Sequence, residues 1–191
     1  MRISKVFPIV LALFISVPGV LNAQSTEALN EGRSYKLLLQ VVVGSAVSET
    51  DNEVSPAVRS AIVGLGPEFG YDRYTTAASL YGPLGINGQA QWKLVPKKLG
   101  SFGSGAMPIF AEWNIGTIES VPGNPSLVEI RRFLFTLRIP AAIRESVNYE
   151  SIGLTLNRVR AEAGKTSVIG NLPVPETGEM LFFVVKIDEI R

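Results

Sequence analysis

The stretch that decides the fold is Tyr35–Val43, with the sequence Tyr-Lys-Leu-Leu-Leu-Gln-Val-Val-Val. Large apolar residues stand at every second position from Tyr35 to Val43, which is the period of a β-strand. Leu38 and Val42 make the alternate face partly apolar as well. We therefore expect this strand to be central in its sheet and not at an edge.

One helix is predicted after this strand. Ser55-Pro56 is typical of a helix start, because serine caps the first free N–H groups and proline fits the first turn. Gly66-Pro67 is expected to end the helix. Between them, apolar residues recur at helical spacing and form one stripe, namely Val58, Ile62 and Leu65. A short amphipathic helix that covers a sheet is the expectation.

The rest of the chain predicts strands separated by turns rich in glycine and proline. In chain order, the segments with strand character are 71–80, 89–95, 108–119, 127–139, 149–160, 166–172 and 180–190. The third and fourth flank Val121–Pro125, a turn by composition, so we expect them to pair as a hairpin. Pro140–Asn148 is expected to hold a turn of helix, and the last three segments a three-stranded meander.

The expected fold class follows from this count of elements. The pattern is mainly β (α+β), with about eight strands in a sandwich or curved antiparallel sheet and one short covering helix. We see no internal repeat and no low-complexity tract.

The N-terminus has the pattern of a secretory signal peptide. Arg2 and Lys5 supply positive charge, Val6–Val17 is an apolar core, and Pro18-Gly19 precedes a small residue, Ala23, at the expected cleavage site. The alternative is an uncleaved single-pass anchor, although the apolar run is shorter than the ~20 residues that span a bilayer. We expect removal of residues 1–23, with no stable membrane anchor left and a periplasmic or extracellular location.

The remainder is expected to be one domain. Residues 24–34 are polar and are predicted to form a flexible lead-in, and residues 35–191 a single β-rich domain. The chain carries 18 lysines and arginines against 17 aspartates and glutamates. Because a nearly neutral chain lacks the concentrated basic face that nucleic acid requires, no nucleic-acid partner is expected.

Two residue types are missing from the composition, and this excludes whole classes of chemistry. There is no histidine and no cysteine. Their absence removes the Ser-His-Asp and Cys-His arrangements, most zinc sites, thiol catalysis and iron–sulfur ligation. We expect no catalytic, cofactor-binding or metal-binding residues and no enzymatic activity.

Three short motifs suggest chemistry but fit simpler structures better. Ala163–Ser167 resembles the end of a phosphate-binding P-loop, yet Val159 stands where the first glycine belongs and the segment lies between strands. A turn with Gly164 at positive φ is favoured. Gly100–Gly105 is expected to be an inter-strand loop, since it lacks the setting of a dinucleotide loop. Glu49–Glu53 is expected to be a solvated acidic loop without the ligand spacing of a calcium site.

A carboxylate-pair hydrolase survives the absence of histidine, because it needs only two acidic groups at the correct distance. The candidate acids are Glu68, Asp72, Glu112 and Glu150. Nothing in the sequence brings any two of them together. The aromatic residues expected in the sheet core are Trp92, Trp113, Phe133 and Phe135. Tyr71 and Tyr74, beside the end of the predicted helix, are candidates to line a groove.

The C-terminal segments resemble a known pattern. Ala163–Leu172 followed by Met180–Ile190 is similar to the closing hairpin of bacterial secretin β-domains, where Gly-x-x-x-Val-Ile-Gly-Gly-Leu precedes an apolar strand; Asn171 stands in place of the second glycine. The opening Tyr35–Leu65 is similar to small exported bacterial proteins of unknown function that share this ending. The resemblance implies a periplasmic, envelope-associated module; it does not imply a pore.

The leading functional hypothesis is an exported, non-enzymatic, envelope-associated protein that acts through contacts with a protein partner. Strand addition at an exposed sheet edge is the binding mode expected of such a domain. The alternatives are a secreted carboxylate-dependent hydrolase, and a small-molecule or lipid carrier with an apolar cavity between sheet and helix.

Overall fold

The computed structural model describes residues 34–46, 54–84, 89–96, 99, 108–143, 146–174 and 177–190. At 141–143 and 146–147 it describes the backbone only. The signal peptide, the lead-in before Ser34, the acidic loop Glu49–Glu53 and the loop Gly100–Gly105 lie outside the described residues.

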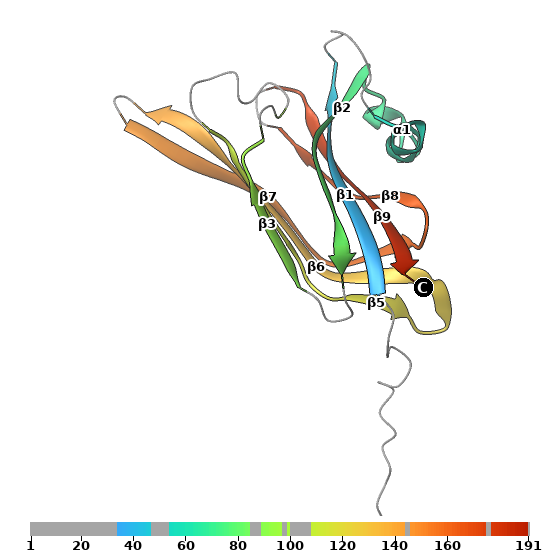
Figure 1. The fold of residues 1–191 in the computed structure, drawn as a ribbon. Coiled ribbons are helices and arrows are strands. Elements are labelled where there is room, and N and C mark those ends of the chain that lie inside the picture. Colours follow the sequence, from blue (N-terminus) through green and yellow to red (C-terminus); the bar gives the residue numbers. More distant parts are fainter. Residues whose placement is uncertain are drawn as a thin grey trace, which may run out of the picture.

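Two antiparallel sheets and one short helix make up the fold (Figure 1). Sheet A has the strand order β2-β1-β9-β8, with bounds β1 Ser34–Ser45, β2 Arg73–Leu84, β8 Thr166–Pro173 and β9 Met180–Ile190. Sheet B consists of β3 Ala90–Leu94, β4 Phe110–Ile115, β5 Ile118–Val121, β6 Asn124–Ile143 and β7 Ser146–Glu162. The helix α1 is Pro56–Val63, and a single 3₁₀ turn, η2, is Pro67–Phe69. The prediction of a mainly β fold with one covering helix is confirmed.

The main core lies between the two sheets and is built on β1. As predicted, β1 is central, because it pairs with β2 on one side and with β9 on the other. Its odd-numbered residues from Tyr35 to Val43 are buried and face sheet B. On the facing strands, the Phe183 ring lies 4.6 Å from that of Phe135 and 5.5 Å from that of Phe133, between ring centroids. Burial of each such ring contributes about 1.5–3 kcal/mol to folding.

The helix covers the outer face of sheet A. The Ser55 hydroxyl accepts a hydrogen bond from the Val58 N–H at 3.4 Å, so the predicted cap is confirmed. The side chains between α1 and sheet A form a second buried cluster, consisting of Val42, Val58, Ile62, Tyr74, Phe182 and Val184. Leu65 lies beyond the end of the helix and is 44% exposed, so the predicted stripe ends at Ile62.

Tyr71 and Tyr74 belong to this second cluster and do not line a groove. Tyr74 is fully buried, its hydroxyl donates to the Phe69 carbonyl, and it accepts from the Tyr71 N–H at 3.0 Å. Both tyrosine rings pack against Phe182. Partial burial raises the pKa of the Tyr71 phenol above its ordinary value, and the neighbouring Tyr74 raises it further.

Sheet B bends sharply where β4 gives way to β5 (Figure 1). Across the bend the pairing with β6 keeps its register: Ile115 lies opposite Phe133, and Ile118 lies opposite Ile130. The buried face nevertheless changes from odd to even positions on β6, since Phe133 and Ile130 are both buried. On β7, the residues that face the core change in the same way, from even positions up to Leu156 to odd positions from Val159. The change of face occurs at Gly116 and at Arg132, whose φ is +64°.

The bend explains why the described residues form nine strands, one more than the number expected. The predicted strand 108–119 is divided into β4 and β5 at Gly116. Both parts pair with β6, so the predicted hairpin around Val121–Pro125 is confirmed. The chain reverses at Pro122-Gly123, where Gly123 has a φ of +79°.

Two local predictions are wrong. The turn of helix expected in Pro140–Asn148 is replaced by extended chain, because β6 and β7 continue to pair from Pro140–Tyr149 to Ile143–Ser146. The meander contains only the β8–β9 hairpin, since β7 pairs with β6 in sheet B. The turn after Glu162 carries the chain from one sheet to the other, which local sequence patterns cannot reveal.

Candidate functional site

The four candidate acids do not form a catalytic pair. Glu68 and Asp72 lie in the segment that follows α1, while Glu112 and Glu150 lie on sheet B. Glu112 on β4 lies opposite Thr136 on β6, and Thr136 lies opposite Gly153 on β7. Glu150 is three residues before Gly153 on the same strand. Because strand side chains alternate, Glu112 and Glu150 point to opposite faces.

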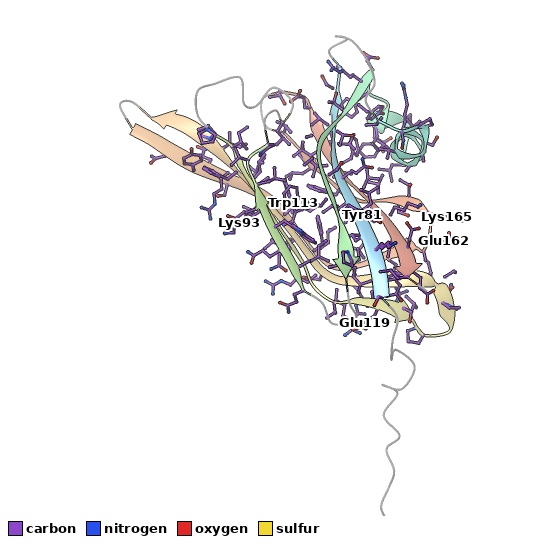
Figure 2. All side chains as sticks on the ribbon, in the orientation of Figure 1. Tyr81, Lys93, Trp113, Glu119, Glu162 and Lys165 are labelled. Atoms are coloured by element: carbon purple, nitrogen blue, oxygen red, sulfur yellow. The ribbon has the colours of Figure 1, made fainter. Side chains whose placement is uncertain are left out.

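Glu112 is instead part of a charged row on the outer face of sheet B. Its carboxylate lies 3.3 Å from the Lys93 ammonium and 3.9 Å from the Arg138 guanidinium. Figure 2 shows Lys93 on the side of the sheet away from sheet A, whereas Trp113 points into the layer between the sheets. Glu112 is therefore engaged in ion pairs with two cations on this face of the sheet. Among the described residues, no group of three or more acidic side chains could hold a metal ion.

The Gly-Lys-Thr segment forms the predicted turn. Gly164 has a φ of +79°, and its N–H donates to the Ile187 carbonyl at 2.7 Å, so this amide is not free to bind phosphate. The Lys165 ammonium lies 2.7 Å from the Glu162 carboxylate (Figure 2). The segment connects two strands and no helix follows it. It therefore lacks the geometry of a P-loop.

A groove of about 720 Å³ lies between this turn, α1 and the outer face of sheet A. Its volume is in the range of small-ligand sites. Its lining is mixed, and includes Leu38, Gln40, Ser60, Thr166 and Val184 together with Lys165 and Lys186. The Lys186 ammonium already pairs with Asp188 at 3.3 Å. The apolar cavity expected of a carrier is not found here, since buried side chains fill the space directly under α1.

The most distinctive surface is the far end of the β6–β7 hairpin. The pairing between β4 and β6 ends at Arg138 of β6, which lies opposite Phe110. From Ile139 to Ile143, β6 pairs only with β7 among the described strands. Figure 1 shows this two-stranded segment projecting beyond both sheets. We refer to the paired residues 139–143 and 146–150 as the arm.

Exposed apolar side chains gather at the base of the arm. Phe110 and Tyr149 are 37% and 39% exposed, and their ring centroids lie 5.5 Å apart. Val95, which is 54% exposed, directly follows Leu94, the partner of Ala111 on β4, and so lies at the same end of the sheet. Half of the six large apolar residues that are exposed in the described chain therefore occur here. We call Val95, Phe110 and Tyr149 the arm patch.

A second feature of sheet B lies at the bend. Glu129 is only 8% exposed, although it is charged. Three guanidiniums surround its carboxylate: Arg160 Nε at 3.1 Å, Arg158 Nε at 3.4 Å and Arg131 Nε at 3.6 Å. Arg131 also reaches the Glu119 carboxylate at 3.0 Å. We call these five residues the arginine cluster.

Neither feature was predicted from the sequence. The arm patch unites a residue of β4, a residue of β7 and Val95, which follows β3. The arginine cluster depends on the pairing of β6 with β5 and β7. Arg158 and Arg160 stand at alternate positions of a strand, and this was the one local signal available. For the aromatic residues predicted in the core, Trp113, Phe133 and Phe135 are buried, while Trp92 is half-buried.

Comparisons with known proteins identify no sequence family. No family model matches the chain, and no curated protein matches it. Among solved structures, the chain is similar to the secretin InvG of the Salmonella SPI-1 type III secretion injectisome, in its open-gate state and from residue 176 to its end. The identity is 11% and the TM-score is 0.35, over 83% of this chain and 61% of that one. The chain thus spans less than two thirds of the length of that structure. No described helix has the length and apolar character to cross a membrane.

Proposed function

We propose that this chain is an exported, envelope-associated protein that acts through protein–protein contacts and performs no catalysis, with the arm and its patch as the principal contact. The proposal of export rests on the signal-peptide pattern of residues 1–23. The proposal of protein contact rests on one observation above all. This is the projection of a two-stranded arm with exposed aromatic residues at its base.

An isolated two-stranded ribbon is marginally stable in water, because it lacks a third strand or a packed face. The arm has this character from Ile139 outward, where β4 has ended. Both of its edges lack a paired strand among the described residues, so their N–H and C=O groups can accept an added strand. A partner that pairs with the arm would stabilise it by completing the sheet.

The arm patch would supply the apolar part of such a contact. Aromatic residues are enriched at the centres of protein interfaces, where they bury large areas with few rotatable bonds. Phe110 is held in place by β4, whose neighbouring residue Ala111 is buried, and by contact with the Tyr149 ring. Phe110 is therefore positioned before a partner arrives, and this lowers the entropic cost of binding.

The hydrolase alternative gains no support from these arrangements. Glu112 is paired with two cations, Lys93 and Arg138. Among the described residues, no second carboxylate shares either cation with it. A turnover lost in Glu112→Gln would revive that alternative.

The proposal is tested by site-specific photocrosslinking in the cells that produce the protein. A benzophenone amino acid is placed at Tyr149 and, in a separate chain, at Tyr81, which is 70% exposed on β2 of the other sheet. We expect a discrete adduct with one envelope protein from position 149 and none from position 81.

A second variant makes the test specific to the patch. Phe110→Ser in the chain labelled at position 149 should weaken the contact about thirtyfold, the effect of about 2 kcal/mol at an aromatic hot spot. Identical products from positions 149 and 81, or an adduct that survives Phe110→Ser in a chain with unchanged urea stability, would contradict the proposal.

A further inference from the structure

The arginine cluster is more than an internal ion-pair network, because most of its hydrogen-bonding capacity is unused. Each guanidinium has five N–H donors. Glu129 accepts a hydrogen bond from Nε of Arg160 at 3.1 Å and lies 3.4 Å from Nε of Arg158. The structure gives neither arginine a second partner among the described residues. Their side chains are 67% and 57% exposed. The Nη groups at the outer ends of both guanidiniums therefore face solvent.

Glu129 restrains the side chains of these arginines. A carboxylate that is 8% exposed between three guanidiniums restrains long side chains that would otherwise be mobile. The cluster holds three positive and two negative charges, and so retains net positive charge after the internal pairs have formed. Arg132 at the bend is also exposed and adds a further positive charge. Restrained guanidiniums with free ends match the geometry of a carboxylate, which accepts two parallel hydrogen bonds.

The spacing of the two arginines indicates what kind of anion fits. Arg158 and Arg160 point to the same face of β7, because Val159 between them packs against the core. Their Cα atoms are separated by two strand residues, about 6.6 Å. An extended polypeptide presents its alternate side chains at the same interval.

We propose that the arginine cluster is a binding site for an extended acidic polypeptide segment, in which two carboxylates at alternate positions each bind the outer end of one guanidinium, of Arg158 and of Arg160. The site lies at the bend, seven residues along β6 from Arg138 and hence about 23 Å from the base of the arm. It is independent of the arm patch, and either contact can exist without the other.

A polypeptide fits this surface better than an anionic membrane. Glu119 and Glu129 stand among the arginines, so a uniformly negative plane would meet repulsion as well as attraction. A strand with acidic residues at alternate positions avoids these two carboxylates, because its charges lie only over the arginines.

The test uses the purified protein and two fluorescein-labelled hexapeptides. One alternates glutamate with threonine, and the other has the same composition with its three glutamates together. Fluorescence anisotropy at low salt should show saturable binding with clear preference for the alternating peptide, and weaker binding as salt is added. Equal affinity for the two peptides, or no saturable binding, would overturn the proposal.

Matched variants locate the site. Arg158→Gln should weaken binding about tenfold, the loss expected for one charge-assisted pair. Arg138→Gln changes the net charge equally at the other end of sheet B and should have less than about a twofold effect, as expected of a distant, screened charge. Arg131 and Arg160 remain beside Glu129 in Arg158→Gln, so the fold is preserved. A similar loss in both variants would overturn the assignment.

A third variant tests the direction of the effect. The Glu119 carboxylate lies 3.0 Å from an Nη atom of Arg131 and contributes negative charge to the cluster. Glu119→Gln should therefore tighten binding of the alternating peptide, a result that a purely structural network would not give. No change or weaker binding would count against the site. Vesicles of phosphatidylglycerol serve as a separate probe. Tighter binding to these vesicles than to the peptide, lost in Arg158→Gln, would replace the polypeptide by a membrane surface and overturn the proposal.

Discussion

Substitution of Gly116 by alanine should destabilise the protein strongly, because the bend in sheet B leaves no room for a side chain at this position. A Cβ built on Gly116 would lie well inside contact distance of the Arg131 carbonyl oxygen, and 3.4 Å from the Arg132 Cβ. The obstacle is backbone from the paired strand, which cannot rotate away. The strands would have to separate at the point where the sheet changes its buried face.

The expected magnitude follows from the hydrogen bonds at this point. The Gly116 N–H donates to the Arg132 carbonyl at 2.8 Å, and the Arg131 N–H donates to the Thr117 carbonyl at 2.8 Å. Each bond contributes about 1 kcal/mol net, and each group left unpaired costs about 1–3 kcal/mol. Gly116→Ala should therefore lower the free energy of unfolding by about 2–4 kcal/mol.

Urea unfolding followed by tryptophan fluorescence measures this change, because Trp113 is buried in the folded protein. With a denaturant slope of about 2 kcal/mol/M, the midpoint should fall by about 1–2 M. The matched control is Gly82→Ala on β2, where an added Cβ would meet no atom within 4 Å. That variant should be neutral or more stable by up to about 1 kcal/mol, since alanine reduces the freedom of the unfolded chain. Equal midpoints for the two variants would refute the account of the bend.

Three further changes test the helix, the arginine cluster and the second buried cluster. Ser55→Ala should lower the free energy of unfolding in urea by about 1 kcal/mol, because the hydrogen bond from the Val58 N–H to the capping hydroxyl is lost. The control is Ser79→Ala, which should have no effect. Glu129→Gln should destabilise by about 1–2 kcal/mol at low salt and by less in 0.5 M salt, since three guanidiniums lose their shared anion. Because the pKa of Tyr71 is raised in the folded protein, the unfolded chain loses this proton at lower pH. The contribution of Tyr71 to the free energy of unfolding should therefore be constant below about pH 10 and fall above it. Tyr71→Phe should make this fall in the alkaline unfolding curve shallower, and an unchanged slope would contradict the assignment.

The elements with strong local patterns were predictable from the sequence. Tyr35–Val43 alternates because one face of β1 meets sheet B, and its apolar second face lies partly under α1. Ser55-Pro56 and Gly164 act through their own backbone conformations, so their roles need no knowledge of the rest of the chain. In each case the decisive interaction joins residues that are near in sequence.

The bend and the arm could not be predicted in this way. The change of buried face at Gly116 depends on three strands that change together, and Arg132 takes a positive φ that is unusual for its side chain. The helical turn expected in Pro140–Asn148 failed because cross-strand pairing overrides the weak local preference of this segment. The surfaces proposed for binding arise from these same long-range pairings, and this is why the residues of the arm patch and the arginine cluster had no visible connection in the sequence.

Hydrogen–deuterium exchange along β7 tests the central claim most directly. The purified protein is compared with the protein bound to the partner captured through position 149. The account predicts that amides of arm residues 148–150 exchange rapidly in the free protein, because a two-stranded ribbon is only marginally stable even though these residues pair with β6. They should exchange at least about tenfold more slowly in the complex, where an added strand pairs with the arm. Unchanged exchange at the arm, with protection appearing instead on β2 or around α1, would contradict it.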